Sequence, residues 1–383
     1  MIVRVAGYDA VLLVSFGGPE GPGDVLPFLR NVTAGRDVPA ARLAAVAEHY
    51  TAFGGVSPIN AQNRALASAL ATELAPRRVY WGNRNWAPYL PETLAQMRAD
   101  GVARAAVFVT AAYASYSSCR QYREDLAAAH PGELQLEKLR HYYNHPGFIA
   151  AQTEQVLALG DRLADHATLL FTAHSIPLAS ARTSGPAGGA YPAQLAEAAR
   201  LVAAQVREAS GWRGSFDVAW QSRSGPPAVP WLEPDVNDRL EALAAEGIRD
   251  VVAVPVGFVS DHVEVRYDLD TEAAATARRV GIRFARAGTV ATSRSFVTMV
   301  RELIEEREDG LPRVALGTDG PSHDVCPLRC CPARVARPAA AGEPQDMQTA
   351  NIREDREPGA GRLVIEPMHR EGDRTSRALE RKT

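Results

Sequence analysis

The segment YDAVLLVSFGGP (residues 8–19) has the same form as HATLLFTAHSIP (residues 166–177). Each is an apolar run, typical of a buried strand, that ends in a tight turn. A longer pair follows: WGNRNWAPYLPETLAQMRADGVARAAVFVTAAYAS (residues 81–115) and WQSRSGPPAVPWLEPDVNDRLEALAAEGIRDVVAVPVGFVSD (residues 220–261). Both members of that pair read as strand, loop, helix, glycine and strand. The two halves of the chain therefore resemble each other.

Helical periodicity is expected at residues 40–49, 60–74 and 191–209, between the apolar runs. Strands that alternate with helices predict parallel sheets built from βαβ units. We therefore predict an α/β protein of two similar Rossmann-like domains, at about residues 1–150 and 151–310. A chain of 383 residues is long enough for two cores. Strand ends would face a central cleft between the halves, where a ligand binds.

The charge balance excludes some partners. Lys and Arg number 42 against 45 Asp and Glu, a net charge of −3. No basic block interleaves with aromatic residues, so nucleic acid is not an expected partner. The N-terminus runs into a strand pattern without the features of a secretory signal, and no apolar run approaches the roughly 18 residues of a membrane span. We expect a cytoplasmic protein without a membrane span.

The composition changes after about residue 310, where Pro, Gly, Arg and Glu dominate. Residues 311–331 carry a cysteine cluster. Residues 332–383, which include the short apolar LVIEP, have weak periodicity and are predicted to be a largely disordered tail.

The segment GFVSDHVEVRYDLDTE (residues 257–272) passes from an apolar strand into a helix. Glu264, Asp268 and Glu272 recur in it at four-residue spacing and so share one helix face. Like charges at this spacing repel one another and destabilise the helix unless cations bind to them. The spacing therefore predicts a route or site for a metal ion or an amine. A solvated acidic face is the alternative.

His174 and Glu264 both follow apolar runs, at predicted strand ends. Open α/β sheets keep their ligand sites at such ends. There a neutral imidazole can take a proton, and a carboxylate can orient it or bind a metal ion. Either residue taken alone fits a structural role as well.

The chain has four cysteines: Cys119 and the cluster Cys326, Cys330 and Cys331. In a cytoplasmic protein, four thiols suit a metal or iron–sulfur site better than disulfides. A four-thiolate site closed by Cys119 would fix the C-terminal segment to the first domain. Zinc and a two-iron cluster both fit four thiolates, and incidental free cysteines are the remaining alternative.

The motifs LLVSFGGPEGP, HYTAFGGVSPIN, TAHSIP, WQSRSGPP and GFVSDHVEVRYDLD together resemble the ferrochelatase family, in particular its actinobacterial members, over residues 8–310. The resemblance implies a chelatase-type fold and the insertion of ferrous iron into a porphyrin. For actinobacterial members it implies coproporphyrin III as substrate and coproheme as product. The alternatives are insertion into protoporphyrin IX, and a non-catalytic iron or haem carrier or iron–sulfur sensor on the same scaffold.

The resemblance also assigns roles to residues. It implies that His174 removes pyrrole protons beside Glu264, that both meet the substrate iron, and that Asp268 and Glu272 line a path for iron. Phe16 stands where some relatives carry a tyrosine that approaches the iron. The positions expected around the porphyrin ring are Phe16, Arg30, Tyr50, Ser57, Tyr116, Ser222 and Arg223.

For the cysteines, the resemblance implies a two-iron two-sulfur cluster bound by Cys119, Cys326, Cys330 and Cys331, with a structural or sensory role. Bacterial relatives are monomers, so a monomer is expected. Another enzyme of the haem pathway is expected to accept the product.

Overall fold

The computed structural model describes residues 7–36, 38–129, 132–225, 227–327 and 329–333. Within them the strands form two four-stranded sheets, and all neighbouring strands run parallel. The first sheet, in the order β2-β1-β3-β4, comprises β1 (Ala10–Ser15), β2 (Arg78–Asn83), β3 (Arg104–Val109) and β4 (Gln135–Lys138). The second, in the order β6-β5-β7-β8, comprises β5 (Thr168–His174), β6 (Phe216–Gln221), β7 (Asp250–Val254) and β8 (Arg283–Arg286).

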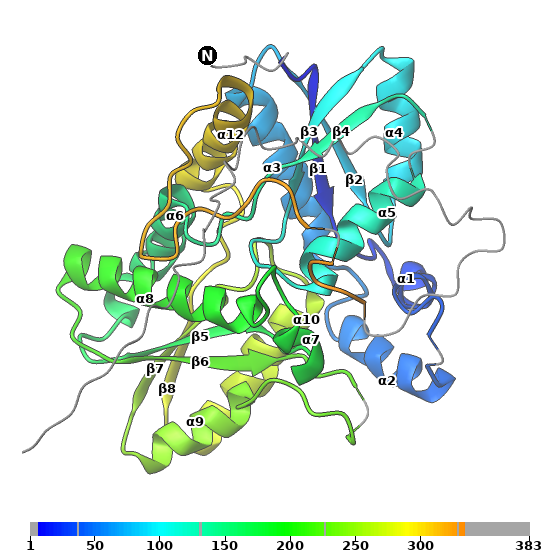
Figure 1. Cartoon of the computed structure of the whole chain (residues 1–383). Coiled ribbons are helices and arrows are strands. Elements are labelled where there is room, and N and C mark those ends of the chain that lie inside the picture. The colour runs from blue at the N-terminus through cyan, green and yellow to red at the C-terminus, as the bar shows by residue number, and fades with distance from the viewer. Residues whose placement is uncertain (1–6, 37, 130–131, 226, 328, 334–383) are drawn as a thin grey trace, which may run out of the picture. The chain divides into compact units, whose positions relative to one another are not determined.

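The two sheets have the same strand order, which confirms the duplicated α/β architecture (Figure 1). The central strand β1 is buried along its whole length, and β5 is buried up to His174. Strands buried on both faces read as continuous apolar runs, which is why AVLLVS and LLF showed no alternation.

Helices connect the strands. In the first half these are α1 (Val25–Val32), α2 (Ala40–Thr51), α3 (Ile59–Glu73), α4 (Leu90–Ala99) and α5 (Gln121–Ala129), with the short helical segments η1 (Pro22–Asp24) and η2 (Tyr116–Arg120). In the second they are α6 (Pro146–Leu157), α7 (Leu178–Arg182), α8 (Ala190–Ser210), α9 (Val236–Ala245), α10 (Val263–Arg266), α11 (Ala274–Arg279) and α12 (Arg294–Asp309), with η3 (Gly160–Arg162) and η4 (Tyr267–Ala273). The helices predicted at residues 40–49, 60–74 and 191–209 are confirmed as α2, α3 and α8.

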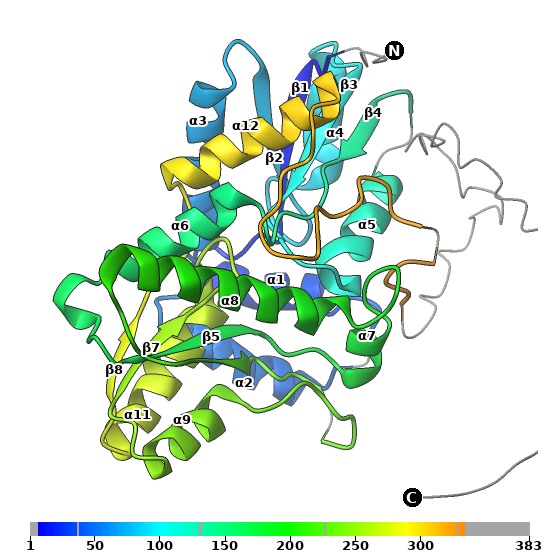
Figure 2. The same cartoon turned by 60° about the vertical axis from the view of Figure 1, so that its left-hand side comes forward.

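The last helix, α12, follows the second sheet in sequence but packs against α3 and α6 (Figure 2). Its apolar face carries Phe296, Val300 and Leu303 into the largest core. Ion pairs join it to the first half, among them Arg301–Glu73 at 2.8 Å, Arg77–Glu308 at 2.8 Å and Arg140–Glu306 at 2.7 Å. The helical cover of the first sheet is thus completed from the end of the second half.

The chain after α12 lies against the first half without further helix or strand, as far as residue 333. Leu316 donates its backbone N–H to the Asn144 carbonyl, and the Asn144 amide donates to the Gly320 carbonyl at 2.8 Å. This path brings the cysteine segment towards α5. Almost all of the predicted tail at residues 332–383, including LVIEP, lies outside the described residues.

Gly55, in the FGGVSP turn after α2, has φ +73°. A Cβ atom there would lie 2.5 Å from Pro22 Cα, so the turn requires glycine. No helix among the described residues is both long enough and apolar enough to cross a membrane.

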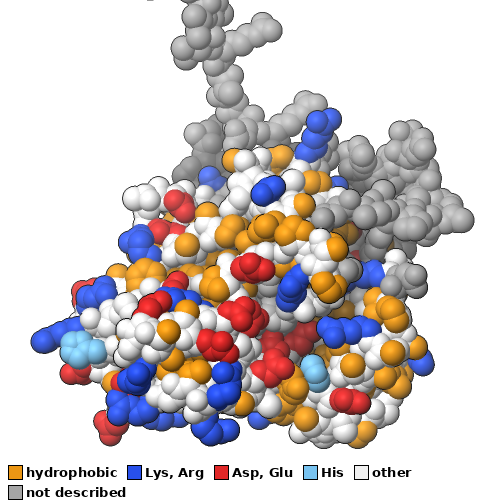
Figure 3. All heavy atoms as spheres, turned by 90° about the horizontal axis from the view of Figure 1, so that it is seen from below, with side chains coloured by type: hydrophobic (Ala, Val, Ile, Leu, Met, Phe, Trp, Pro, Cys, Tyr) orange, Lys and Arg blue, Asp and Glu red, His pale blue; other side chains and the backbone are white. Residues whose placement is uncertain are grey.

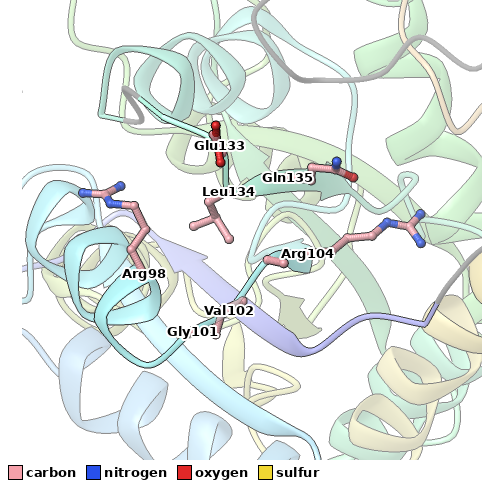
Figure 4. Close-up of a pocket in the computed structure, with 8 residues that line it drawn as sticks. Arg98, Gly101, Val102, Arg104, Glu133, Leu134 and Gln135 are labelled. Atoms are coloured by element: carbon pink, nitrogen blue, oxygen red, sulfur yellow. The ribbon is translucent and has the colours of Figure 1, made fainter.

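A pocket of about 420 Å³ lies at the amino ends of β3 and β4 (Figure 4). Its lining residues are Arg98, Gly101, Val102, Ala103, Arg104, Glu133, Leu134 and Gln135. It is at the opposite end of these strands from the carboxyl ends, where parallel sheets hold their ligands.

Candidate functional site

His174 is the last residue of β5 and lies beside Gln221, the last residue of β6. Its ring Nδ1 is 2.6 Å from the Ser175 carbonyl oxygen, and the Tyr191 hydroxyl donates to the His174 carbonyl at 2.8 Å. A carbonyl only accepts, so Nδ1 carries the proton in the neutral ring. The lone pair is therefore on Nε2, where it can take up a proton.

Glu264, on α10, faces that nitrogen. Its Oε2 is 4.0 Å from His174 Nε2 and 4.0 Å from His262 Nδ1. The side chains of His174 and Glu264 are 35% and 44% exposed, so a ligand can reach both. Burial lowers the pKa of His262, which favours its neutral form. The carboxylate thus lies between two imidazoles, and of these His174 is the accessible one.

Asp268 follows on η4 and is held by the end of β6. Gln221 donates its amide to Asp268 Oδ2 at 3.2 Å, and the Ser222 hydroxyl donates to the same oxygen. The pKa of Asp268 is raised to about 7, chiefly by burial and in addition by the charges of Glu264 and Glu272, while the two hydrogen bonds oppose the shift. The three carboxyl groups are therefore close enough to interact, on a helix whose middle part is a π-helix.

Glu272 is the exposed end of this acidic line. Burial raises its pKa, and nearby His49 opposes the shift. The His49 ring stacks on Tyr267, with centroids 3.8 Å apart and planes at 8°. His49 was not predicted from the sequence, although it directly precedes Tyr50 in HYTAFGG. Seen from below the view of Figure 1, the molecule shows acidic side chains gathered near the middle of one face (Figure 3).

An aromatic row from the first half approaches the same carboxylate. Phe16 meets Phe28 edge-on at 6.2 Å, and Phe28 is 5.9 Å from Tyr50. Burial and then the Glu264 charge raise the pKa of Tyr50 well above its usual value. Across the two halves, the Asp261 backbone N–H donates to Gln62 at 2.8 Å. Tyr50 thus belongs to the surroundings of Glu264, and Phe16 to the aromatic row that leads to Tyr50.

The other residues that were expected around the porphyrin ring have hydrogen-bond partners elsewhere, or, among the described residues, no hydrogen bond or ion pair joins them to His174 or Glu264. Arg223 donates to the Pro227 and Val229 carbonyls of its own loop at 3.1 and 3.2 Å. The Tyr116 hydroxyl donates to Glu124 at 3.0 Å. Ser57 is buried in the turn beside Gly18, and Arg30 is exposed on α1.

The four cysteines come together from two distant parts of the chain, residue 119 and residues 326–331. Cys119 Sγ is 3.9 Å from Cys326 Sγ, and Cys330 Sγ is 3.7 Å from Cys331 Sγ. Ligand atoms of His323, Cys326 and Cys330 all lie within 4.8 Å of one another. His323 was not predicted from the sequence either, although it lies three residues before Cys326, a common spacing for metal ligands.

The surroundings of these thiols suit a thiolate-bound metal group. Cys119, Cys330 and Cys331 are buried, and Ala114 and Ala190 pack against the cluster. Together with His323, the thiols supply donor atoms that could hold a metal ion. A single ion bound by four thiolates fits the donors as well.

The ferrochelatase family model matches residues 8–308 of the chain. The chain belongs to the ferrochelatase family. Among curated ferrochelatases, it is 59% identical to the coproporphyrin III ferrochelatase of Frankia alni, over 84% of this chain and 86% of that protein. It is 53% identical to the coproporphyrin III ferrochelatase of Streptomyces griseus, over 88% and 96%. The likeness to the solved structure of SirB from Bacillus subtilis with Fe3+ is distant, at 11% identity and a TM-score of 0.47 over 78% of this chain and 96% of that one.

Proposed function

We propose that this ferrochelatase inserts ferrous iron into coproporphyrin III, releasing two protons and giving coproheme. The observation that carries the proposal is the His174–Glu264 pair, with an accessible Nε2 lone pair 4.0 Å from a carboxylate that heads an acidic line. The names of the similar actinobacterial proteins support coproporphyrin III as the substrate.

In the proposed reaction, His174 Nε2 takes a pyrrole proton as iron enters the ring. Glu264 stabilises the resulting imidazolium, whose Nδ1–H continues to donate to the Ser175 carbonyl. Asp268 and Glu272 attract ferrous iron towards Glu264, because divalent cations favour carboxylate oxygens. Divalent charge entering the line also favours ionised Asp268, whose pKa burial has raised.

Phe16 and Tyr50 would contact the flat ring of the porphyrin. Arg30 and Arg223 are proposed to bind its propionates, with Tyr116 and Ser57 at the edge of the site. Ser222 donates to Asp268, so we assign it to holding that carboxyl group rather than to a propionate.

We also propose that Cys119, Cys326, Cys330 and Cys331 bind a two-iron two-sulfur cluster. When bound, that group would cross-link the segment after α12 to η2, which precedes α5. A cytoplasmic monomer that passes coproheme to a later enzyme of the haem pathway completes the proposal.

The first experiment follows the loss of free-porphyrin fluorescence under anaerobic conditions, with ferrous iron and either coproporphyrin III or protoporphyrin IX. We expect faster loss with coproporphyrin III. Preference for protoporphyrin IX would reject the proposed substrate, and inactivity with both would favour a carrier or sensor.

His174→Ala tests the proposed base. We expect insertion to slow about 10²- to 10⁴-fold, the usual contribution of a positioned acid or base, with porphyrin binding nearly unchanged. His166→Ala changes an exposed histidine just before β5 and serves as the matched control. If porphyrin binding and insertion are lost together in His174→Ala, the residue has a folding role instead.

A further inference from the structure

Tyr191 contacts the end of β5 from α8, outside the second sheet. It is the second residue of α8, and its hydroxyl donates to the His174 carbonyl at 2.8 Å. The side chain is buried, with 6% of its surface exposed. Burial raises the pKa of Tyr191 well above its usual value, so the hydroxyl keeps its proton at neutral pH and acts as a donor. The contact is made to the backbone of the proposed base.

The carbonyl that accepts this bond lies where β5 loses one of its two neighbouring strands. The pairing of β5 with β7 ends at Phe171, whereas the pairing with β6 continues to His174. Beyond it, the Ser175 N–H still donates to the Gln221 carbonyl of β6 at 2.8 Å. The N–H and C=O of one peptide group point in opposite directions, so the His174 carbonyl is turned away from β6. The Tyr191 hydroxyl thus makes the hydrogen bond that a strand on the β7 side would make.

This peptide group sets the direction of the next carbonyl, which holds the imidazole. The Ser175 carbonyl oxygen is 2.6 Å from His174 Nδ1, and the Ser175 hydroxyl donates to the Leu232 carbonyl at 2.9 Å. A backbone rotation at Ser175 would move its carbonyl away from the ring. The neutral imidazole would then be free to turn or to exchange tautomers, because the bond at one ring nitrogen decides which nitrogen carries the proton. The orientation of the Nε2 lone pair therefore depends on the peptide group that Tyr191 holds.

Tyr191 is itself fixed without help from His174. Its backbone N–H donates to the Ser184 hydroxyl at 2.8 Å. Its ring centroid lies 5.8 Å from that of Trp220, with the planes at 35°, and the ring meets Tyr113 edge-on at 6.3 Å. The backbone and the ring make these contacts, so replacing the tyrosine by phenylalanine removes the hydroxyl and leaves the packing in place.

We propose that Tyr191 is a positioning residue for iron insertion: its hydroxyl holds the His174–Ser175 peptide group so that the imidazole keeps its Nε2 lone pair towards Glu264. The inference rests on the proposed role of His174 as the base. Tyr191 acts through the backbone of His174 and takes no part in the proton transfer itself. Its effect should therefore appear in the rate of insertion and in the state of the His174 ring, while the binding of porphyrin stays the same.

The test compares Tyr191→Phe with wild type in two measurements. In the insertion assay, we expect kcat to fall about tenfold, less than for loss of the base itself, with the KM for porphyrin and for iron nearly unchanged. In the intact protein without substrate, nitrogen-15 magnetic resonance of labelled histidines distinguishes a protonated from an unprotonated ring nitrogen, and His174→Ala identifies the His174 signals. Wild type should carry the proton on Nδ1, and Tyr191→Phe should show a mixture of tautomers.

Tyr142→Phe is the matched control. Tyr142 is buried, and its hydroxyl donates to the carbonyl of Val109, the last residue of β3, at 3.0 Å. This variant loses the same kind of hydrogen bond at the end of a strand in the other sheet. It should lower the midpoint of urea denaturation by an amount similar to that for Tyr191→Phe, without changing kcat or the His174 signals.

Equal losses of kcat in the two variants, or unchanged His174 signals in Tyr191→Phe, would overturn the inference. A wild type that inserts no iron, with the tautomer change still confined to Tyr191→Phe, would reject the proposed reaction and keep Tyr191 as the residue that positions the imidazole. The failure of the inference and the failure of the proposed function therefore give different results.

Discussion

At the scale of single residues, Asp268 has the most unusual chemistry in the acidic line. Its carboxyl group is largely removed from water, and its pKa of about 7 lies well above the usual 3.8. Because the native state binds a proton that the unfolded chain releases, stability falls as the pH rises from about 4 to about 7. The group destabilises the fold at the pH where it is charged and able to attract iron.

Asp268→Asn should therefore weaken the attraction of iron and stabilise the fold at neutral pH. Relative to wild type, we expect the free energy of unfolding of the variant to rise by about 2 kcal/mol between pH 5 and pH 8. Urea denaturation at the two pH values measures this difference. Asp161→Asn, at an exposed carboxyl group, should show no such rise. An equal effect of Asp268→Asn at both pH values would contradict the raised pKa.

Ser222→Ala removes a hydrogen bond that favours the charged form of Asp268. The pKa of Asp268 should rise further, so the pH below which the KM for iron increases should move upward. The KM for porphyrin should change little, because Ser222 is directed at the carboxyl group. Ser224→Ala, two residues further along the same loop, is the control. A larger effect on porphyrin than on iron would return Ser222 to the propionate-binding role expected from the sequence.

At the scale of elements, the helix that carries the carboxylates shows what the sequence could predict. Four-residue spacing correctly indicated that Glu264, Asp268 and Glu272 come close together. It did not reveal the π-helix at Tyr267–Ala273, because no local residue pattern distinguishes a widened turn from an α-helix. The hydrogen bonds from the end of β6 to Asp268 were equally hidden, since they depend on tertiary contacts.

The strand ends were easier to predict than the ring contacts. His174 followed an apolar run, and a parallel strand must end where its apolar run ends. Arg223 donates instead to the carbonyls of its own loop, and the Tyr116 hydroxyl donates to Glu124, eight residues further along the chain. Long polar side chains choose among several nearby partners, so motif position alone does not fix their direction.

Deleting Thr271 tests the π-helix as a unit. A π-bulge amounts to one extra residue within a helix, so its removal should restore an α-helix while keeping buried Leu269 and Ala273 near their places. We expect far-UV circular dichroism to be nearly unchanged, and the KM for iron to increase about tenfold or more, because Glu272 would turn relative to Asp268. Thr271→Ala keeps the residue count and should behave as wild type. Normal iron dependence in the deletion variant would show that the widened turn is dispensable.

At the scale of the whole molecule, α12 joins the two halves. Arg140 and Glu306 form an ion pair whose side chains are 1% and 7% exposed. Glu306 also accepts the Val314 backbone N–H at 3.0 Å, so it holds the start of the cysteine segment. The halves are therefore expected to unfold together, although the sequence suggested separate domains at residues 1–150 and 151–310.

Glu306→Ala leaves a buried guanidinium without its partner, which typically costs about 3 to 5 kcal/mol. Urea denaturation should show one transition at a lower midpoint. Glu305→Ala removes a partly exposed i,i+4 pair with Arg301 and should cost only about 0.5 kcal/mol. Two separate transitions in the wild type would instead support independent domains.

The return of α12 to the first half also sets the order of events on the ribosome. The faces of α3 and α6 that α12 covers in the finished protein have no partner until residues 294–309 have left the exit tunnel. At about 5 to 20 residues per second, translating the second half takes on the order of ten seconds or more. During that interval the apolar face of α3 is open to chaperones, and the nascent chain cannot complete its fold until α12 has left the tunnel.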